Sequence, residues 1–247
     1  ELVKQNDIER PDRKVSEGEK FGYDYSIHIR RAEFWGQAEY TLRRWEFFIA
    51  ITSGWQQVYR AGHVANGKFP EGSKGRSDIK SLPASGIRSG ALFKFNGRHY
   101  LSFCSNLMSS QPAASDMFIS PTVRNDLVSN LSNETIAGAE LTYHLRRPGL
   151  RARFTAYANS IGNQLWLRTY WHDEYNATVN MIMRNVRTDY SGIEAAVEKE
   201  LGNHSLLAGA SFAQARDATS PVASSTPAVP PATSAPRMSR GPRSHVR

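Results

Sequence analysis

Tight turns recur along this chain at a regular spacing, and that spacing limits the folds open to it. Asn96-Gly97-Arg98 contains the Asn-Gly pair, which is the strongest short signal for a β-hairpin. Leu42-Arg43-Arg44, Arg147-Pro148-Gly149 and Gly202-Asn203-His204 are similar, so the four turns lie roughly 51 to 55 residues apart. Each interval also contains one longer polar segment. The sequence therefore predicts a repeating order of tight turn, strand, long loop, strand and tight turn.

The longer polar segments are residues 62–81, 108–133 and about 171–177. Because antiparallel strands reverse at every connection, this order places all tight turns at one end of a sheet and all long loops at the other. Such asymmetry is typical of an outer-membrane β-barrel, which has short periplasmic turns and long external loops. A soluble β-sandwich has no reason to separate its connections so regularly.

The run WEFFIAITSGWQQVYR, residues 45–60, predicts an unusually long strand. Trp45, Phe47, Ile49 and Ile51 alternate with other residues, which indicates one apolar face near the start of the strand. Most strands have about 5–6 residues, whereas this run would span about 50 Å at roughly 3.3 Å per residue. A membrane needs only about 9–11 residues of a tilted strand. We therefore expect the first half of the run to cross a bilayer and the second half to continue beyond it.

The same alternation predicts further strands beside every turn, with charged or polar residues on the opposite face. The expected apolar positions are Ala32, Phe34, Ala38, Tyr40, Leu42, Ile87, Ala91, Phe93, Phe95, Leu101, Phe103, Ala139, Leu141, Tyr143, Leu145, Leu150, Ala152, Phe154, Ala156, Ile193, Ala195, Val197, Leu206, Ala208, Ala210 and Phe212. Aromatic residues near the turns predict an interfacial girdle, and these are Tyr40, Trp45, Tyr100 and Tyr143. Alternation alone fits both a membrane barrel and a soluble sandwich, but turn asymmetry and strand length favour the barrel.

Composition excludes several classes of protein. The longest apolar run in the 247 residues is Phe47–Ile51, far short of the 18 or more residues of a transmembrane helix. The single cysteine, Cys104, excludes an internal disulfide framework and a cysteine-based zinc site. The net charge of +8 is spread along the chain without a basic cluster before residue 217. Dispersed, solvated charge explains it better than a nucleic-acid-binding face.

Three regions of the chain differ in composition. Residues 1–20 are charged and lack periodicity, so we expect a loop or linker, whereas residues 21–216 contain the alternating segments. Residues 217–247 contain six of the twelve prolines and no aromatic residue, which predicts a disordered tail. The abrupt change near Asp217 suggests translation in a shifted reading frame, which resequencing of the coding DNA would test. The opening, Glu1-Leu2-Val3-Lys4, lacks an initiator Met and suggests a piece of a longer chain.

About residues 20–216 resemble the barrel of a TonB-dependent outer-membrane receptor. The similar stretches are FGYDYSIHIRRAEFWGQAEYTLRRWEFFIAITSGWQQVYRAGHVANGKFPEGSKGRSDIKS, FISPTVRNDLVSNLSNETIAGAELTYHLR, LWLRTYWHDEYNATVNMIMRNV and YSGIEAAVEKEL. The resemblance implies an all-β fold in which an antiparallel meander of about eight strands forms roughly a third of a 22-stranded barrel. Such receptors finish on a strand with a terminal aromatic residue, whereas this chain ends Ser244-His245-Val246-Arg247.

The resemblance also implies a location and partners. Receptors of this family lie in the outer membrane, contact its lipid, and import scarce nutrients such as ferric chelates, cobalamin or glycans. The TonB complex drives import through an N-terminal plug and box, and both are absent from this chain. A third of a barrel would leave two unpaired edge strands, which promote aggregation. We therefore expect the chain to be inactive by itself.

Polar and aromatic residues of the predicted loops are the candidate ligand contacts. They are Arg124 and Asp126 in the segment 108–133, and Trp171, His172, Asp173, Glu174 and Tyr175 in the segment 171–177. Aromatic rings beside paired acids suit a sugar or a cation. The same residues also suit a hydrated loop with anchoring aromatics, and Arg124 and Asp126 also suit pairing within their loop.

Other chemistry has little support in the sequence. The seven histidines show no metal-ligand spacing, and Gly72-Ser73-Lys74-Gly75 lacks the strand–helix context of a phosphate-binding loop. The sequence shows no catalytic triad or carboxylate pair, so it predicts neither an enzyme nor a cofactor. One alternative function is a soluble, lectin-like β module that uses Trp166, Trp171 and Tyr175 on loops. A basic RNA-binding sheet ranks lower, because it needs aromatic and basic residues on one face.

Overall fold

One antiparallel sheet of long strands dominates the computed structural model, which describes residues 3–4, 7–67, 69–173, 177–218 and 222–227. Eight long strands follow one another in the order β11-β10-β9-β8-β7-β6-β4-β3. They are β3 (Tyr25–Leu42), β4 (Trp45–Gly62), β6 (Lys80–Lys94), β7 (His99–Ser110), β8 (Glu134–Arg147), β9 (Leu150–His172), β10 (Ala177–Leu201) and β11 (His204–Asp217). The predicted all-β antiparallel meander of about eight long strands is therefore confirmed.

Four short strands complete the described structure. β1 (Val3–Lys4) pairs with β2 (Lys14–Val15), so a short ladder lies within the segment predicted as a loop or linker. β5 (Gly75–Arg76) pairs with the end of β4, and β12 (Val222–Pro227) pairs with β10. The described residues contain no helix that is long and apolar enough to cross a membrane.

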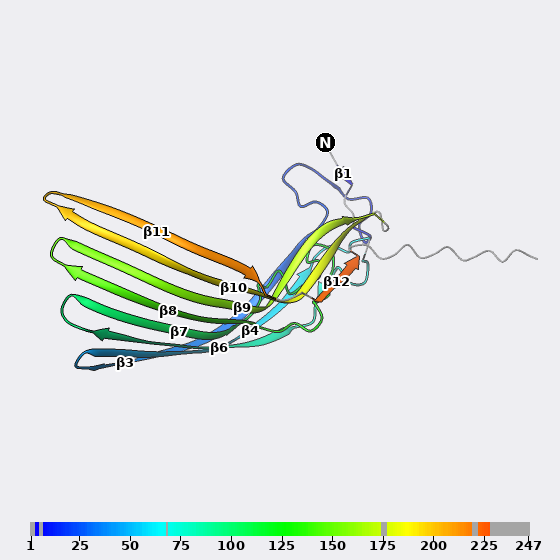
Figure 1. Ribbon diagram of the computed structural model, residues 1–247. Coiled ribbons are helices and arrows are strands. Elements are labelled where there is room, and N and C mark those ends of the chain that lie inside the picture. Colours follow the sequence, from blue (N-terminus) through cyan, green and yellow to red (C-terminus); the bar gives the residue numbers. More distant parts are fainter. Residues whose placement is uncertain (1–2, 5–6, 68, 174–176, 219–221, 228–247) are drawn as a thin grey trace, which may run out of the picture.

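The four predicted tight turns lie together at one end of the sheet, at the left in Figure 1, and the longer connections lie at the other end. Pro148-Gly149 and Gly202-Asn203 each join two strands directly, and both glycines have positive φ angles, of 67° and 63°. Glycine adopts this left-handed conformation without the steric cost of a Cβ atom. Glycine chemistry thus determines where these two hairpins reverse, and the predicted separation of turns from loops is confirmed.

The third predicted loop is shorter than the sequence indicates. β9 continues to His172 and β10 begins at Ala177, and Trp171 pairs with Thr178. The prediction that Trp171 and His172 lie in a loop is therefore wrong. Residues 169–171 are Thr, Tyr and Trp, which all favour extended backbone. They extend the ladder with β10 to the last residues before the connection.

The strand register places the predicted apolar residues of all eight strands on one face, which we call the outer face. Two adjacent rows of cross-strand neighbours are Leu42, Trp45, Phe93, Leu101, Tyr143, Phe154, Ala195 and Ala210, and Tyr40, Phe47, Ala91, Phe103, Leu141, Ala156, Ile193 and Phe212. Many of these side chains are exposed, from 40% for Phe47 to 69% for Phe212. The outer face therefore presents a continuous apolar band.

The opposite face, which we call the inner face, is more polar. The row between the two apolar rows contains Thr41, Glu46, Leu92, Ser102, Thr142, Thr155, Glu194 and Ser211. Tyr100 also lies on this face, between Lys94 and His144. Its predicted place in the outer aromatic girdle is wrong, because an offset of one residue along a strand reverses the face.

The inner face is also where close contacts require glycine. A Cβ atom at Gly90 would lie 2.3 Å from a ring carbon of Phe48 and 2.9 Å from the carbonyl oxygen of Phe103. Because any larger residue would collide with both neighbours, Gly90 allows the Phe48 ring to cover the adjoining strand. A glycine covered by an aromatic ring is a known way to pin strand register.

A hydrophobic core forms where the connection 111–133 folds onto the inner face. Met117 and Phe118 of this connection are almost fully buried and cluster with Val58 of β4 and Ile182 of β10. Because β4 and β10 are not neighbours in the sheet, the sheet has to curve for one loop to join them. The cluster also contains Leu82, Val128 and Leu131.

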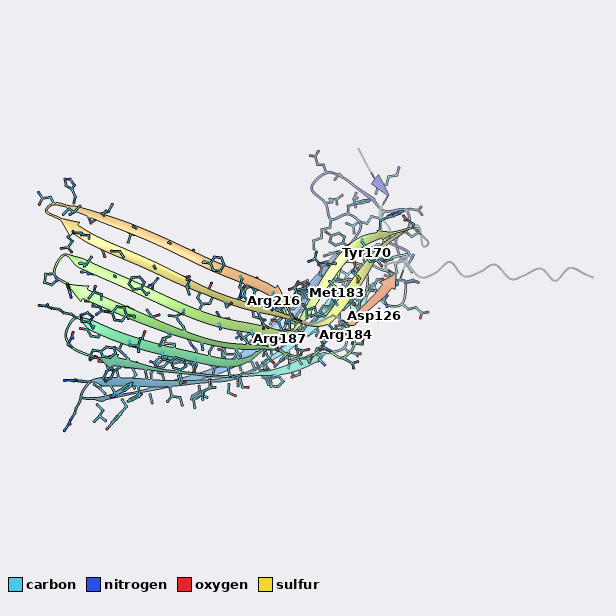
Figure 2. All side chains as sticks on the ribbon, in the orientation of Figure 1. Asp126, Tyr170, Met183, Arg184, Arg187 and Arg216 are labelled. Carbon is cyan, nitrogen blue, oxygen red and sulfur yellow. The ribbon has the colours of Figure 1, made fainter. Side chains whose placement is uncertain are left out.

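β9 and β10 bend beside this core. Their register shifts twice, between Met183 and Val186 and between Val186 and Thr188. Asn163 and Asn185 have positive φ angles of 55° and 58° there, which asparagine tolerates better than most residues. β-bulges of this kind bend a strand and increase its twist. Figure 2 shows the bend, where Met183, Arg184 and Arg187 are labelled.

The sheet is open, and its C-terminal edge differs from the prediction. Within the described residues no pairing joins the edge strands β3 and β11. β11 pairs with β10 as far as Thr188, and β12 continues along the same side of β10 from Arg184 to Val179. The prediction of disorder is wrong for residues 222–227, because an open edge offers backbone donors and acceptors to almost any sequence. The rest of the predicted tail, apart from residues 217 and 218, lies outside the described residues.

Candidate ligand-binding site

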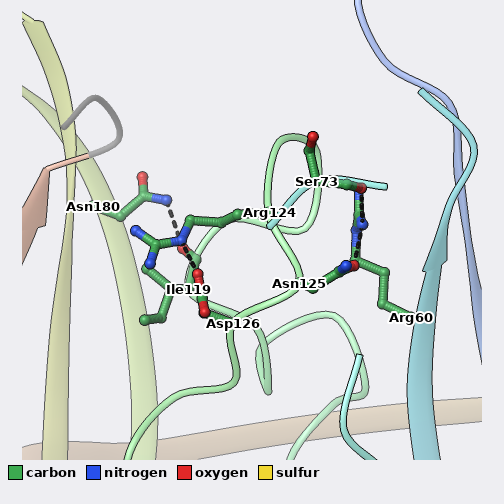
Figure 3. A network of polar contacts seen from close by, with 7 residues as sticks. All are labelled: Arg60, Ser73, Ile119, Arg124, Asn125, Asp126 and Asn180. Carbon is green, nitrogen blue, oxygen red and sulfur yellow. Dashed lines mark hydrogen bonds and ion pairs between the residues drawn. The ribbon is translucent and has the colours of Figure 1, made fainter. Parts of the chain in front are cut away.

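The two long connections, residues 63–79 and 111–133, are held together by the buried side chain of Arg60 near the end of β4. Arg60 is 1% exposed. Its Nη1 donates to the carbonyl oxygen of Ser73 (2.8 Å) and to the side-chain oxygen of Asn125, and its Nε donates to the carbonyl oxygen of Pro121 (2.6 Å). Figure 3 shows the contacts with Ser73 and Asn125. One guanidinium thus satisfies acceptors from both loops.

The Arg60 side chain keeps its positive charge although it is buried. Burial lowers the pKa of the Arg60 guanidinium, and the neighbouring Tyr25 opposes this by raising it. The ordinary pKa of arginine lies so far above neutral pH that the side chain remains protonated in proteins. The guanidinium also lies over the Tyr25 ring, 5.0 Å from its centroid. The three hydrogen bonds are therefore charge-assisted, and such bonds are stronger than neutral ones.

Backbone packing around Arg60 is equally close. A Cβ atom at Gly62 would lie 1.8 Å from the carbonyl oxygen of Ser73 and 2.5 Å from Nη1 of Arg60. Only glycine allows β4 to approach the loop this closely. Sequence reasoning missed Arg60, because an arginine at an alternating position of a strand looks like any other polar inner-face residue. The glycine two residues later was the available signal.

The predicted ligand contacts Arg124 and Asp126 flank the loop junction. Arg124 pairs with Asp126 through Nε, and its guanidinium lies 4.8 Å from the ring centroid of Phe69. Between them, Asn125 donates its backbone N–H to Gly72 (2.6 Å) and its side-chain amide to the carbonyl oxygen of Lys74 (3.1 Å). This geometry corresponds to pairing within the loops, although the Asp126 side chain is still 48% exposed.

The same loop is also attached to β9 and β10. The side-chain amide of Asn180 donates to the carbonyl oxygen of Ile119 (2.7 Å), as Figure 3 shows, and accepts a hydrogen bond from the hydroxyl of Thr169 (2.8 Å). Arg184 donates to the carbonyl oxygen of Ser129 (3.0 Å). The connection 111–133 is thus bonded at several points to the sheet it covers.

The remaining predicted contacts lie at the tip of the β9–β10 hairpin. Trp171 is 57% exposed and lies two residues beyond Thr169 in one unshifted ladder, so both side chains are on the face that meets the loop. Asp173 is an exposed turn residue, and His172 is the last residue of β9. Glu174 and Tyr175 lie outside the described residues. The structure therefore brings Trp171 and the Asp126 loop to one face and one end of the sheet.

A second concave region lies on the inner face, nearer the tight turns. A hollow of about 620 Å³ is lined by both polar and aromatic side chains, including Trp35, Glu39, Phe48, Arg88 and Cys104. This lining offers both polar and apolar contacts. Within the described residues no group of three or more His, Cys, Asp or Glu side chains is placed to hold a metal ion.

Comparison of this chain with protein-family models, with curated proteins and with solved structures finds no match.

Proposed function

We propose that this chain is part of the wall of a TonB-dependent outer-membrane receptor that imports a scarce nutrient, such as a ferric chelate, cobalamin or a glycan. The observation that supports this proposal is the exposed apolar band on the outer face, combined with a polar inner face and with turns and loops at opposite ends. The sequence resemblance supports the family, and the physical arguments support the position in a membrane.

The apolar band has the height of a bilayer core. On β4 it extends from Trp45 to Trp55, and both tryptophans are 41% exposed on the outer face. These residues are about 33 Å apart along the strand at roughly 3.3 Å per residue. At the usual strand tilt of about 40°, the distance becomes about 25 Å across the membrane, the height of the apolar band of known barrels. Aromatic residues at both limits match the expected interfacial girdles.

The soluble, lectin-like alternative has less support. A soluble sheet with this outer face would expose a large apolar surface, which marks an interaction site or an aggregation hazard. Trp166 and Trp171 both lie in β9, five residues apart in an unshifted ladder, so their side chains point to opposite faces. The two rings proposed to stack on a sugar therefore do not share a surface.

The proposed ligand side is the loop end of the sheet. Asp126, Trp171 and Asp173 remain partly or fully exposed there, and they are our proposed contacts with an incoming nutrient. Arg124 has a supporting role in this proposal, because its side chain already pairs with Asp126.

Single-cysteine labelling along β4 tests the membrane position. In a Cys104→Ser background, each residue from 46 to 54 is replaced by cysteine and labelled with a polarity-sensitive dye after folding into phosphatidylcholine vesicles. Dyes at positions 47, 49 and 51 should report an apolar environment, and the matched inner-face dye at position 50 should report a wetter one. The proposal fails if the emission does not alternate along the strand, or if the chain does not associate with the vesicles.

A further inference from the structure

Above the apolar band, the outer face presents a stack of three side chains from three strands. The imidazole of His28 on β3 stacks on the ring of Tyr59 on β4, with centroids 4.6 Å apart and an interplanar angle of 10°. The guanidinium of Arg76 on β5 lies over the same ring, 4.0 Å from its centroid. β3 and β5 pair with opposite sides of β4, so Tyr59 is held between a ring and a cation.

The register places this stack at a definite height. Tyr59 lies four residues beyond Trp55, the last aromatic residue of the apolar band, and both are on the outer face. Four residues correspond to about 13 Å along a strand, or about 10 Å along the membrane normal at the usual tilt. Arg30 lies on the same face, because it pairs with Gln57 between these two residues. At this height, the polar headgroups of a bilayer surround a membrane protein.

The two arginines of this region, Arg30 and Arg76, form no ion pair among the described residues. Arg30 and Arg76 are both exposed, and among the described residues neither has an acidic partner within the 4.0 Å of an ion pair. Of the acids close to them in the sequence, Asp24 pairs with Lys20 and Glu33 with Arg31, and Asp78 forms no ion pair with Arg76 within 4.0 Å. Stacking uses the flat face of the Arg76 guanidinium and leaves its in-plane N–H groups available, which is the arrangement that binds phosphate through two hydrogen bonds.

We propose that His28, Arg30, Tyr59 and Arg76 form a docking site for the phosphate groups of anionic lipids in the leaflet on the loop side. The site rests on the proposed membrane position of the sheet, because that position brings the headgroups to this height. Charge complementarity favours anionic lipid as the ligand. Two unpaired guanidinium groups and a tyrosine hydroxyl lie on the outer face, which is the face that contacts lipid. The aromatic stack orders the Arg76 side chain in advance, which lowers the entropic cost of binding.

Vesicle binding by the full chain tests this site. The wild type, Arg30→Gln/Arg76→Gln and a matched control, Arg146→Gln/Arg153→Gln, are floated with vesicles of phosphatidylcholine alone or with added phosphatidylglycerol. The control removes two exposed arginines from the inner face, so the change in net charge is the same. A basic residue near an anionic surface contributes about 1 kcal/mol, or about fivefold in affinity. The Arg30/Arg76 variant should therefore lose up to about 25-fold of the preference for anionic vesicles, and the control should keep its preference.

Two results would overturn the proposal: an unchanged anionic preference in the Arg30/Arg76 variant, or an equal loss in the control. Binding to pure phosphatidylcholine is a separate readout, because it depends on the apolar band and not on these arginines. Failure of the wild type to bind neutral vesicles would refute the membrane position itself and, with it, the proposed function. Arg30→Lys/Arg76→Lys guards against misfolding: it keeps both charges but loses the flat guanidinium that lies over Tyr59, so its preference should fall between those of the wild type and of the Gln variant.

Discussion

Replacement of Arg60 by methionine should release both long loops while leaving the strands paired. Methionine keeps a long apolar stem but removes every donor of the guanidinium. Three acceptors then lose their partner, namely the carbonyl oxygens of Ser73 and Pro121 and the side-chain oxygen of Asn125. The contact with Ser73 is buried and the other two are partly buried, so water reaches these acceptors only in part unless the loops move away from the sheet.

The size of the effect follows from this arrangement. A buried acceptor without a partner costs about 1–3 kcal/mol, and a partly buried one costs less, so the one buried and two partly buried acceptors together cost about 3 kcal/mol. Local opening relieves this cost, because it exposes the acceptors to water. The closed state of the loops should therefore be weakened by about 3 kcal/mol, which corresponds to a roughly hundredfold increase in the population of open loops.

Amide hydrogen exchange measured by mass spectrometry is the assay. Peptides from residues 63–79 and 111–133 should exchange roughly a hundred times faster in Arg60→Met, and peptides from the β7–β8 ladder should be unchanged. Arg31→Met is the matched control, since Arg31 is exposed and forms only a surface ion pair with Glu33. Surface pairs contribute about 0–1 kcal/mol. Unchanged loop exchange in Arg60→Met, or equal acceleration in Arg31→Met, would refute the role assigned to Arg60.

Two further changes test the faces of the sheet. Gly90→Val should lower the free energy of unfolding by about 1–3 kcal/mol in a denaturant titration, because a ring occupies the added volume; Gly97→Ala, in open space, should leave it unchanged. Ile49→Lys on the outer face should cost about 2–4 kcal/mol of stability in lipid, whereas Gln37→Lys on the inner face should cost little, and equal losses would contradict the assignment of faces.

The parts of the fold that were predictable depend on short-range chemistry. The side-chain oxygen of Asn96 accepts the backbone N–H groups of the two residues that end its turn, and Gly149 adopts a left-handed backbone. Period-two alternation shows which side of each strand is apolar. These signals need no knowledge of distant residues. They were sufficient for the eight strands, the position of the turns and the separation of turns from loops.

Other features depend on partners that are remote in the sequence. Arg60 forms hydrogen bonds to Pro121 and Asn125, more than sixty residues away. The residues next to Arg60 in the sequence do not predict these contacts. β12 pairs because β10 has a free edge, although its own sequence resembles a disordered tail. The short distance of Tyr100 from a turn predicted a place in the aromatic girdle, but an offset of one residue along the strand places its side chain on the inner face. Trp171 looked like a loop residue, but the pairing of β9 with β10 keeps it in the sheet.

The candidate site shows the same division. The sequence identified Arg124 and Asp126 as chemically suitable, yet whether a loop residue meets a ligand or its own loop depends on packing, and here Arg124 lies against Phe69 and Asp126. The stack of His28, Tyr59 and Arg76 could not be predicted from the sequence for a related reason. Its members come from three strands, and only the register makes them neighbours.

By itself, the sequence determined an antiparallel sheet of long, two-faced strands with its turns at one end, because those properties arise from residues within a few positions of one another. The tertiary structure decided how the long loops fold onto the inner face, how far β9 and β10 extend, and which charged groups have partners. Those outcomes depend on contacts between distant segments, and their energies are set by burial and by the geometry of donors and acceptors, which local sequence patterns do not encode.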